Sequence, residues 1–139
     1  MAATFSKEER AAMRAAVAEE KAAKEGADLE AACAASIAAM NGSDRELAEA
    51  FDQLVRAHTD LRGRTWYGMP AYTNAEGKVV AFFQAAAKFK VRYATIGFQE
   101  TARLDDGLLW PTSYAVTGIT GAERRQLAAL LERAVAGPR

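Results

Sequence analysis

The sequence predicts an α+β protein: a small antiparallel sheet of about four to five strands, with helices packed on one face of the sheet. Apolar residues recur at helical spacing before residue 60 and again after residue 120, whereas residues 64–116 contain runs with strand-like alternation. Short turns separate these runs, and short turns favour antiparallel pairing because parallel strands need long crossovers. At 139 residues the chain is long enough for one core.

Two helices are predicted in the Ala-rich first forty residues, since Ala is the best helix former. Ser6 and Glu9 form a capping box that opens a helix over residues 7–24, in which Met13 and Val17 supply a thin apolar stripe.

Gly26 separates this helix from a second one over residues 28–40. One face of the second helix carries Leu29, Cys33, Ile37 and Met40. We interpret residues 1–42 as a helical N-terminal extension and residues 43–139 as the α+β domain itself.

Two further helices belong to that domain. Ser43 and Glu46 form a second capping box, which opens a helix that runs to about His58. Thr120 and Glu123 form a third box, and the closing helix ends at Gly137 and Pro138. The apolar faces of these two helices carry Leu47, Phe51, Leu54 and Val55, and Leu127, Leu130, Leu131, Ala134 and Val135.

Four strands are predicted between these helices, over residues 64–67, 79–84, 89–98 and 108–116. The third shows the clearest alternation. Because strand side chains alternate between faces, it is expected to place apolar residues on one face and a row of cations on the other. The cations of this row are Lys88, Lys90 and Arg92.

The most unusual segment is Trp66-Tyr67-Gly68-Met69-Pro70-Ala71-Tyr72. Aromatic rings with polar tips suit ligand pockets, and the alternative is that they fill the core at the end of the sheet. We expect a ligand-binding site lined by Trp66, Tyr67, Met69, Pro70 and Tyr72, with Lys88, Lys90 and Arg92 supplying positive charge.

This segment, followed by residues 77–83 and by Lys88-Phe89, resembles the YdhG-like family of bacterial domains, also called domain of unknown function family 1801. The resemblance covers roughly residues 44–135. It implies a frataxin-like α+β fold, and some members of the family have been proposed as iron chaperones. No enzymatic activity is established for the family, so the resemblance implies a fold and a surface rather than a reaction. Residues 98–109 are shorter and more acidic than the corresponding family segment.

Charge is divided along the chain. Residues 1–60 hold 7 Lys and Arg against 12 Asp and Glu, whereas residues 61–139 hold 11 against 6. Attraction between the two halves is the simplest interpretation. The alternative is that the basic residues recognise a small anion or an acidic protein partner. Binding of duplex DNA is not expected, because the net charge is zero and the basic cluster is small.

No catalytic or metal-binding motif is visible, and we expect a non-enzymatic binding module without a cofactor. The single cysteine, Cys33, and the lack of a long apolar run or leader favour a cytoplasmic protein with no membrane span. Two alternatives stay open. Carboxylates of the acidic helices could bind Fe²⁺, as in frataxin-like iron chaperones. The Ala-rich helices could instead mediate formation of a homodimer.

Overall fold

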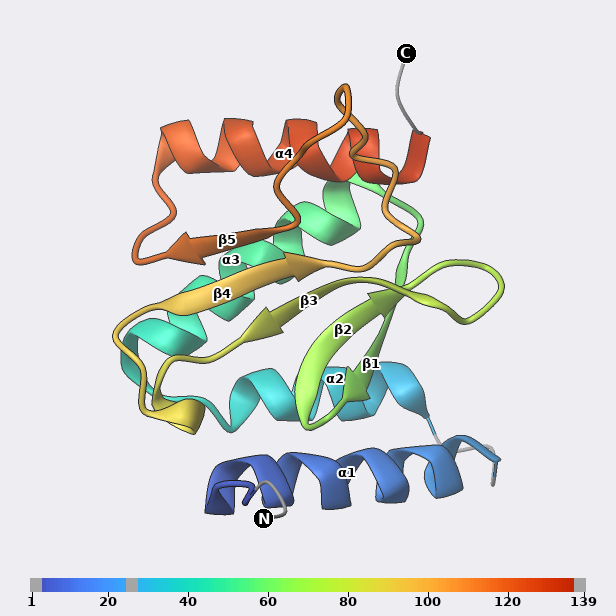
Figure 1. The fold of residues 1–139 in the computed structure, drawn as a ribbon, viewed down its shortest axis with the longest axis vertical. Coiled ribbons are helices and arrows are strands. Elements are labelled where there is room, and N and C mark those ends of the chain that lie inside the picture. The colour runs from blue at the N-terminus through green and yellow to red at the C-terminus, as the bar shows by residue number, and fades with distance from the viewer. Residues whose placement is uncertain (1–3, 25–27, 137–139) are drawn as a thin grey trace.

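A computed structural model of the chain describes residues 4–24 and 28–136 and confirms the α+β class (Figure 1). The helix break predicted at Gly26 and the helix end predicted at Gly137 and Pro138 lie outside these ranges. The elements, in chain order, are α1 (Lys7–Lys24), α2 (Leu29–Ala38), α3 (Gly42–His58), β1 (Arg62–Trp66), β2 (Met69–Thr73), β3 (Val79–Gln84), the short 3-10 helix η1 (Ala87–Phe89), β4 (Ala94–Phe98), β5 (Ser113–Val116) and α4 (Gly121–Ala136).

The five strands form one antiparallel meander in the order β1-β2-β3-β4-β5, so each strand pairs with its neighbour in the chain. Tyr72 lies opposite Ala81, Ala81 lies opposite Phe98, and Phe83 lies opposite Ile96. A bulge in the pairing of β2 with β3 lies beside Val80. Because paired residues share a face, the register collects these large apolar side chains, Tyr72, Phe83, Ile96 and Phe98, on one side of the sheet.

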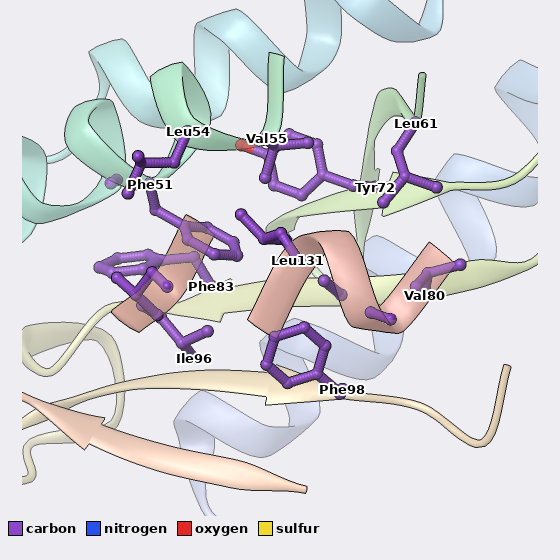
Figure 2. Close-up of a cluster of buried hydrophobic side chains, with 14 of the residues drawn as sticks. Phe51, Leu54, Val55, Leu61, Tyr72, Val80, Phe83, Ile96, Phe98 and Leu131 are labelled. Atoms are coloured by element: carbon purple, nitrogen blue, oxygen red, sulfur yellow. The ribbon is translucent and has the colours of Figure 1, made fainter. Parts of the chain in front are cut away.

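That side is covered by helices and holds the core. Side chains from α2, α3 and α4 pack against the sheet, as predicted for helices on one face (Figure 2). The labelled members of the cluster are Phe51, Leu54, Val55, Leu61, Tyr72, Val80, Phe83, Ile96, Phe98 and Leu131. The apolar faces predicted for α3 and α4 therefore point into the core, except that Val135 is exposed.

Helix α2 belongs to the core as well. Its residues Cys33 and Ile37 are buried members of the cluster, so the core crosses the boundary predicted at residues 42–43. Gly63 on β1 allows the close approach, because a Cβ added there would overlap the Glu30 carboxylate and come within 2.9 Å of the Cys33 sulfur. Burial raises the pKa of the Cys33 thiol to about 11, which fits a small packed residue rather than a nucleophile.

Helix α1 lies beside the β1–β2 hairpin and packs lightly (Figure 1). Its predicted capping box is confirmed: the Ser6 N–H donates to the Glu9 carboxylate at 2.9 Å, and the Glu9 N–H donates to the Ser6 hydroxyl at 3.0 Å. The predicted apolar stripe is wrong, because Met13 and Val17 are exposed and Ala12 is the one buried residue of the helix. An alanine face, not the larger apolar residues, meets the domain.

The capping box predicted at Ser43 and Glu46 is also wrong. Helix α3 begins at Gly42, after Asn41, whose side chain makes no cap hydrogen bond. The acidic residue of the first turn is Asp44, which is buried and accepts hydrogen bonds from the N–H groups of Ala86 and Ala87 at 2.9 and 3.0 Å. Its carboxylate therefore ties the start of α3 to the segment after β3.

The strands differ from the prediction at four places, one of which is β4, which begins at Ala94 and not at residue 89. β1 begins at residue 62, and β2 is a fifth strand that is absent from the four predicted ranges. Gly68 forms the hairpin turn, and Pro70 lies within the second strand. The last strand starts only at residue 113, since Leu108 and Leu109 lie exposed in the preceding loop. None of the helices in the described ranges is long and apolar enough to cross a bilayer.

Candidate functional site

The segment from Trp66 to Tyr72 divides between surface and core. Trp66 is partly exposed at the end of β1, and Tyr67 is exposed in the turn. Met69, Pro70 and Tyr72 are buried, so these three cannot line an open site as predicted. Strand β2 places them inside because it is the second strand of the sheet, flanked on both sides by other strands.

Tyr72 has a structural role. Its hydroxyl donates a hydrogen bond to the Asp52 carboxylate on α3 at 2.8 Å, and its ring meets Phe51 edge-on at 5.7 Å between centroids. Burial, reinforced by the nearby Asp52 charge, raises the pKa of the phenol. Arg56 donates to the same oxygen of Asp52 at 3.3 Å. The Tyr72 hydroxyl is thus already hydrogen-bonded to a carboxylate on α3, so this side chain has no free polar group with which to bind a ligand.

The prediction that three cations form a row on one strand face is wrong. Residues 87–89 form a 3-10 turn, Lys90 adopts a left-handed conformation with φ of 55°, and the strand begins only at Ala94. The cause lies far away in the sequence, because Asp44 on α3 captures the two N–H groups that open this turn. Lys88, Lys90 and Arg92 therefore do not share a strand face.

The three cations have different surroundings. The Lys88 ammonium donates to the Tyr67 carbonyl at 3.1 Å, and the Lys90 ammonium pairs with Glu8 of α1 at 3.2 Å. The contact between Lys90 and Glu8 joins the basic second half of the chain to the acidic first half, whereas Lys88 contacts a carbonyl of its own half. Arg92 stands apart, with its guanidinium 5.1 Å from the centroid of the Tyr93 ring.

The sheet has a second face, opposite the core, that no described helix covers (Figure 1). Register and alternation assign to this open face Arg64, Trp66, Ala71, Phe82, Gln84, Thr95, Gly97, Ser113 and Ala115. The rings of Trp66 and Phe82 lie 5.4 Å apart between centroids, and both are partly exposed. The outer end of the Phe82 ring lies over Gly97, since a Cβ added there would overlap its Cζ and Cε atoms.

The open face is electropositive. The five strands contain no Asp or Glu, and their only charged residues are Arg62 and Arg64. Beside the aromatic pair, a shallow hollow of ≈ 530 Å³ is lined by Gln84, Val91, Arg92, Tyr93 and Thr95. In the described part of the chain, neither Arg64 nor Arg92 has a carboxylate within 4.0 Å. Arg92 is therefore available to an anion from solution, whereas Arg64 also donates from Nε to the Thr65 carbonyl at 2.9 Å.

The site residues predicted from the sequence do not include Phe82, Gln84, Thr95 or Gly97. A signal was present: strand alternation places Phe82 on the face opposite Ala81 and Phe83, so one large aromatic ring of this strand is expected outside the core. What the sequence could not supply was the register that places Phe82 opposite Gly97.

A second hollow, of ≈ 630 Å³, lies between the β2–β3 turn and the end of α4. Arg62, Arg103 and Asp60 contribute its charges. The hollow borders Val135, and the residues that follow α4 lie outside the described ranges, so we assign it no ligand.

No group of three or more His, Cys, Asp or Glu side chains within residues 4–24 and 28–136 is placed to hold a metal ion. The one histidine, His58, lies at the end of α3 with its Nδ1 3.5 Å from a carboxylate oxygen of Glu132. No family model, curated protein or solved structure matches the chain. The resemblance to the YdhG-like family and the binding of Fe²⁺ therefore stay predictions from the sequence.

Proposed function

We propose that the chain is a non-enzymatic binding module whose open face binds a small planar anion. The observation that supports this best is the pair of partly exposed rings, Trp66 and Phe82, on a sheet face that has arginines and no carboxylates. Exposed aromatic rings on a sheet provide a flat surface on which a planar ligand stacks. An arginine fork beside that surface holds a carboxylate or phosphate through two hydrogen bonds.

The spacing along β3 fits a ligand with a ring and an anionic group. Phe82 and Gln84 point to the same face and are two residues apart, which is about 7 Å along a strand. If the ring of a small ligand stacks on Phe82, a substituent of that ring can reach the neighbouring hollow, which is lined by Gln84, Thr95 and Arg92. The amide and the hydroxyl add hydrogen bonds that fix the orientation of the anionic group.

An aromatic carboxylate and a mononucleotide share this chemistry. We would titrate the ¹⁵N-labelled protein with benzoate and, separately, with adenosine monophosphate, and follow backbone amide shifts. We expect saturable shifts at Phe82, Gln84 and Thr95 with at least one of them. Tighter binding of benzoate would indicate an aromatic carboxylate as the ligand, and tighter binding of adenosine monophosphate would indicate a mononucleotide.

The charge test uses Arg92→Glu, with Arg124→Glu on the exposed surface of α4 as the matched control. Arg92→Glu is expected to weaken binding at least 10-fold, whereas the control changes the dissociation constant less than 2-fold. Lys90→Glu is not an equivalent test, because Lys90 already pairs with Glu8. Unchanged affinity in Arg92→Glu, or no saturable shift on the open face with either ligand at millimolar concentration, would refute the proposal.

A further inference from the structure

The turn between β1 and β2 presents two backbone N–H groups that no backbone carbonyl accepts from. Tyr67 and Gly68 both lie in the left-handed region, with φ of 52° and 79°, which is the backbone of a tight two-residue hairpin turn. Positive φ is uncommon for a residue with a side chain, so Tyr67 adopts it only because the hairpin requires it. Successive N–H groups in such a turn point the same way and form a small concavity that suits an anion.

A carboxylate from α1 occupies that concavity. The Tyr67 N–H donates to one oxygen of Glu19 at 2.8 Å, and the Gly68 N–H donates to the other at 2.9 Å. The Lys88 ammonium lies over the turn, because a Cβ added at Gly68 would overlap it, and it donates to the Tyr67 carbonyl. We call these two N–H groups and this ammonium the carboxylate cradle.

Little else holds α1 in place. Its side facing the domain carries alanines between Glu8 and Glu19, and of its described residues only Ala12 is buried. Alanine buries little apolar surface, so such packing stabilises weakly. The Glu8–Lys90 ion pair is on the surface, where ion pairs contribute little. The cradle is therefore the main attachment of a helix whose own formation is secured by its capping box and its alanines.

We propose that the carboxylate cradle is a binding site for an acidic helical segment of a partner protein, and that α1 occupies it in the closed chain and competes with that segment. This site lies at the hairpin tip and does not depend on the ligand proposed for the open face. Charge complementarity supports the choice of occupant: the cradle and Lys90 are positive, and α1 meets them with two glutamates. The spacing of those glutamates defines the ligand.

Glu8 and Glu19 are eleven residues apart, which is three helical turns or about 16 Å along the axis. The side chains on the helical face between them must be small, as those of Ala12, Ala15 and Ala16 are, so that the helix can approach the edge of the sheet. The expected partner segment is thus a helix with two acidic residues at positions i and i+11 and Ala, Gly or Ser on the face between them.

The test uses a synthetic peptide of residues 4–24 as the probe and the full-length chain as the receptor. A tethered segment competes at an effective concentration of about a millimolar, so the intact chain should bind the peptide weakly. Glu19→Gln in the full-length chain releases its own helix from the cradle and should tighten peptide binding about 10-fold. Glu19→Gln in the peptide should weaken binding to the released chain by a similar factor.

Glu20→Gln is the matched control in both molecules, because Glu20 is the exposed neighbour with the same charge, and it should change affinity less than 2-fold. Amide shifts of Tyr67 and Gly68 report binding at the cradle itself. Equal peptide affinity for the intact and the Glu19→Gln chains, or absent binding to the latter at millimolar peptide, would overturn the proposal. If the intact chain is a dimer in sedimentation and the peptide dissociates it, the occupant is a second copy, and the assignment to another protein fails.

Discussion

Replacing Gly97 with alanine tests how the open face is built. In the structure a Cβ at this position would overlap three atoms of the Phe82 ring, so the ring must move away from residue 97. The backbone of Gly97 has no positive φ, and alanine is therefore compatible with the strand itself. The expected effect comes only from the clash between the new methyl group and the ring.

Two opposing terms set the magnitude. Overpacking costs about 1–3 kcal/mol, whereas alanine in a strand gains about 0.5–1 kcal/mol over glycine because it loses less backbone entropy. The net destabilisation is then between zero and about 2.5 kcal/mol, which corresponds to a loss of up to roughly 10 °C in melting temperature for a chain of this length. Gly118→Ala is the control, because a Cβ there meets nothing, and its stability should stay the same or rise by up to about 1 kcal/mol.

A double-mutant cycle decides whether the ring is the cause. Urea unfolding is measured for the wild type, Gly97→Ala, Phe82→Ala and the double variant. Once the ring is absent, Gly97→Ala should be neutral or stabilising, with a coupling free energy of about 1–3 kcal/mol. If Gly97→Ala destabilises equally in both backgrounds, Phe82 does not lie over Gly97, and the proposed aromatic surface is incorrectly described.

Two further predictions concern the polar contacts of the core and its edge. Tyr72→Phe removes the hydrogen bond to Asp52 and should lower the free energy of unfolding, measured by chemical denaturation, by about 1–2 kcal/mol. Tyr67→Phe, at an exposed position, is the control and should leave the free energy of unfolding unchanged. Equal effects of the two substitutions would contradict the structural role of Tyr72. Glu30 accepts a hydrogen bond from the Gly63 N–H at 2.7 Å and pairs with Arg56, and these contacts, the Arg56 contact foremost, hold its pKa below the ordinary 4.5. The stabilising contribution of the Glu30 carboxylate is present above pH 4.5 and is lost as the pH falls through its lower folded-state pKa. In a pH series of thermal melts, the stability difference between the wild type and Glu30→Gln should therefore shrink only below pH 4.5. A constant difference down to about pH 2 would be inconsistent with this pKa shift.

Local sequence patterns determined most of the helices. Ser6 and Glu9 exchange two hydrogen bonds, and Glu123 accepts hydrogen bonds from the N–H and the hydroxyl of Thr120. Each pair is only three residues apart, so its geometry needs nothing from the rest of the chain. The strand at residues 79–84 and the apolar faces of α2, α3 and α4 also followed from residue type and period. These features depend on neighbours within about two helical turns, and a sequence contains that information directly.

The candidate sites depended on contacts between distant residues. Residues 88–92 alternate like a strand, yet Asp44, more than forty positions earlier, captures the N–H groups at Ala86 and Ala87 and makes a turn instead. In the same way, Glu19 reaches the hairpin turn from α1, and pairing of β3 with β4 places Phe82 over Gly97. The sequence by itself determined where helices and strands could form. Only the tertiary structure decided which polar groups were already satisfied and which were left for a ligand, because hydrogen bonds between distant segments leave no local pattern.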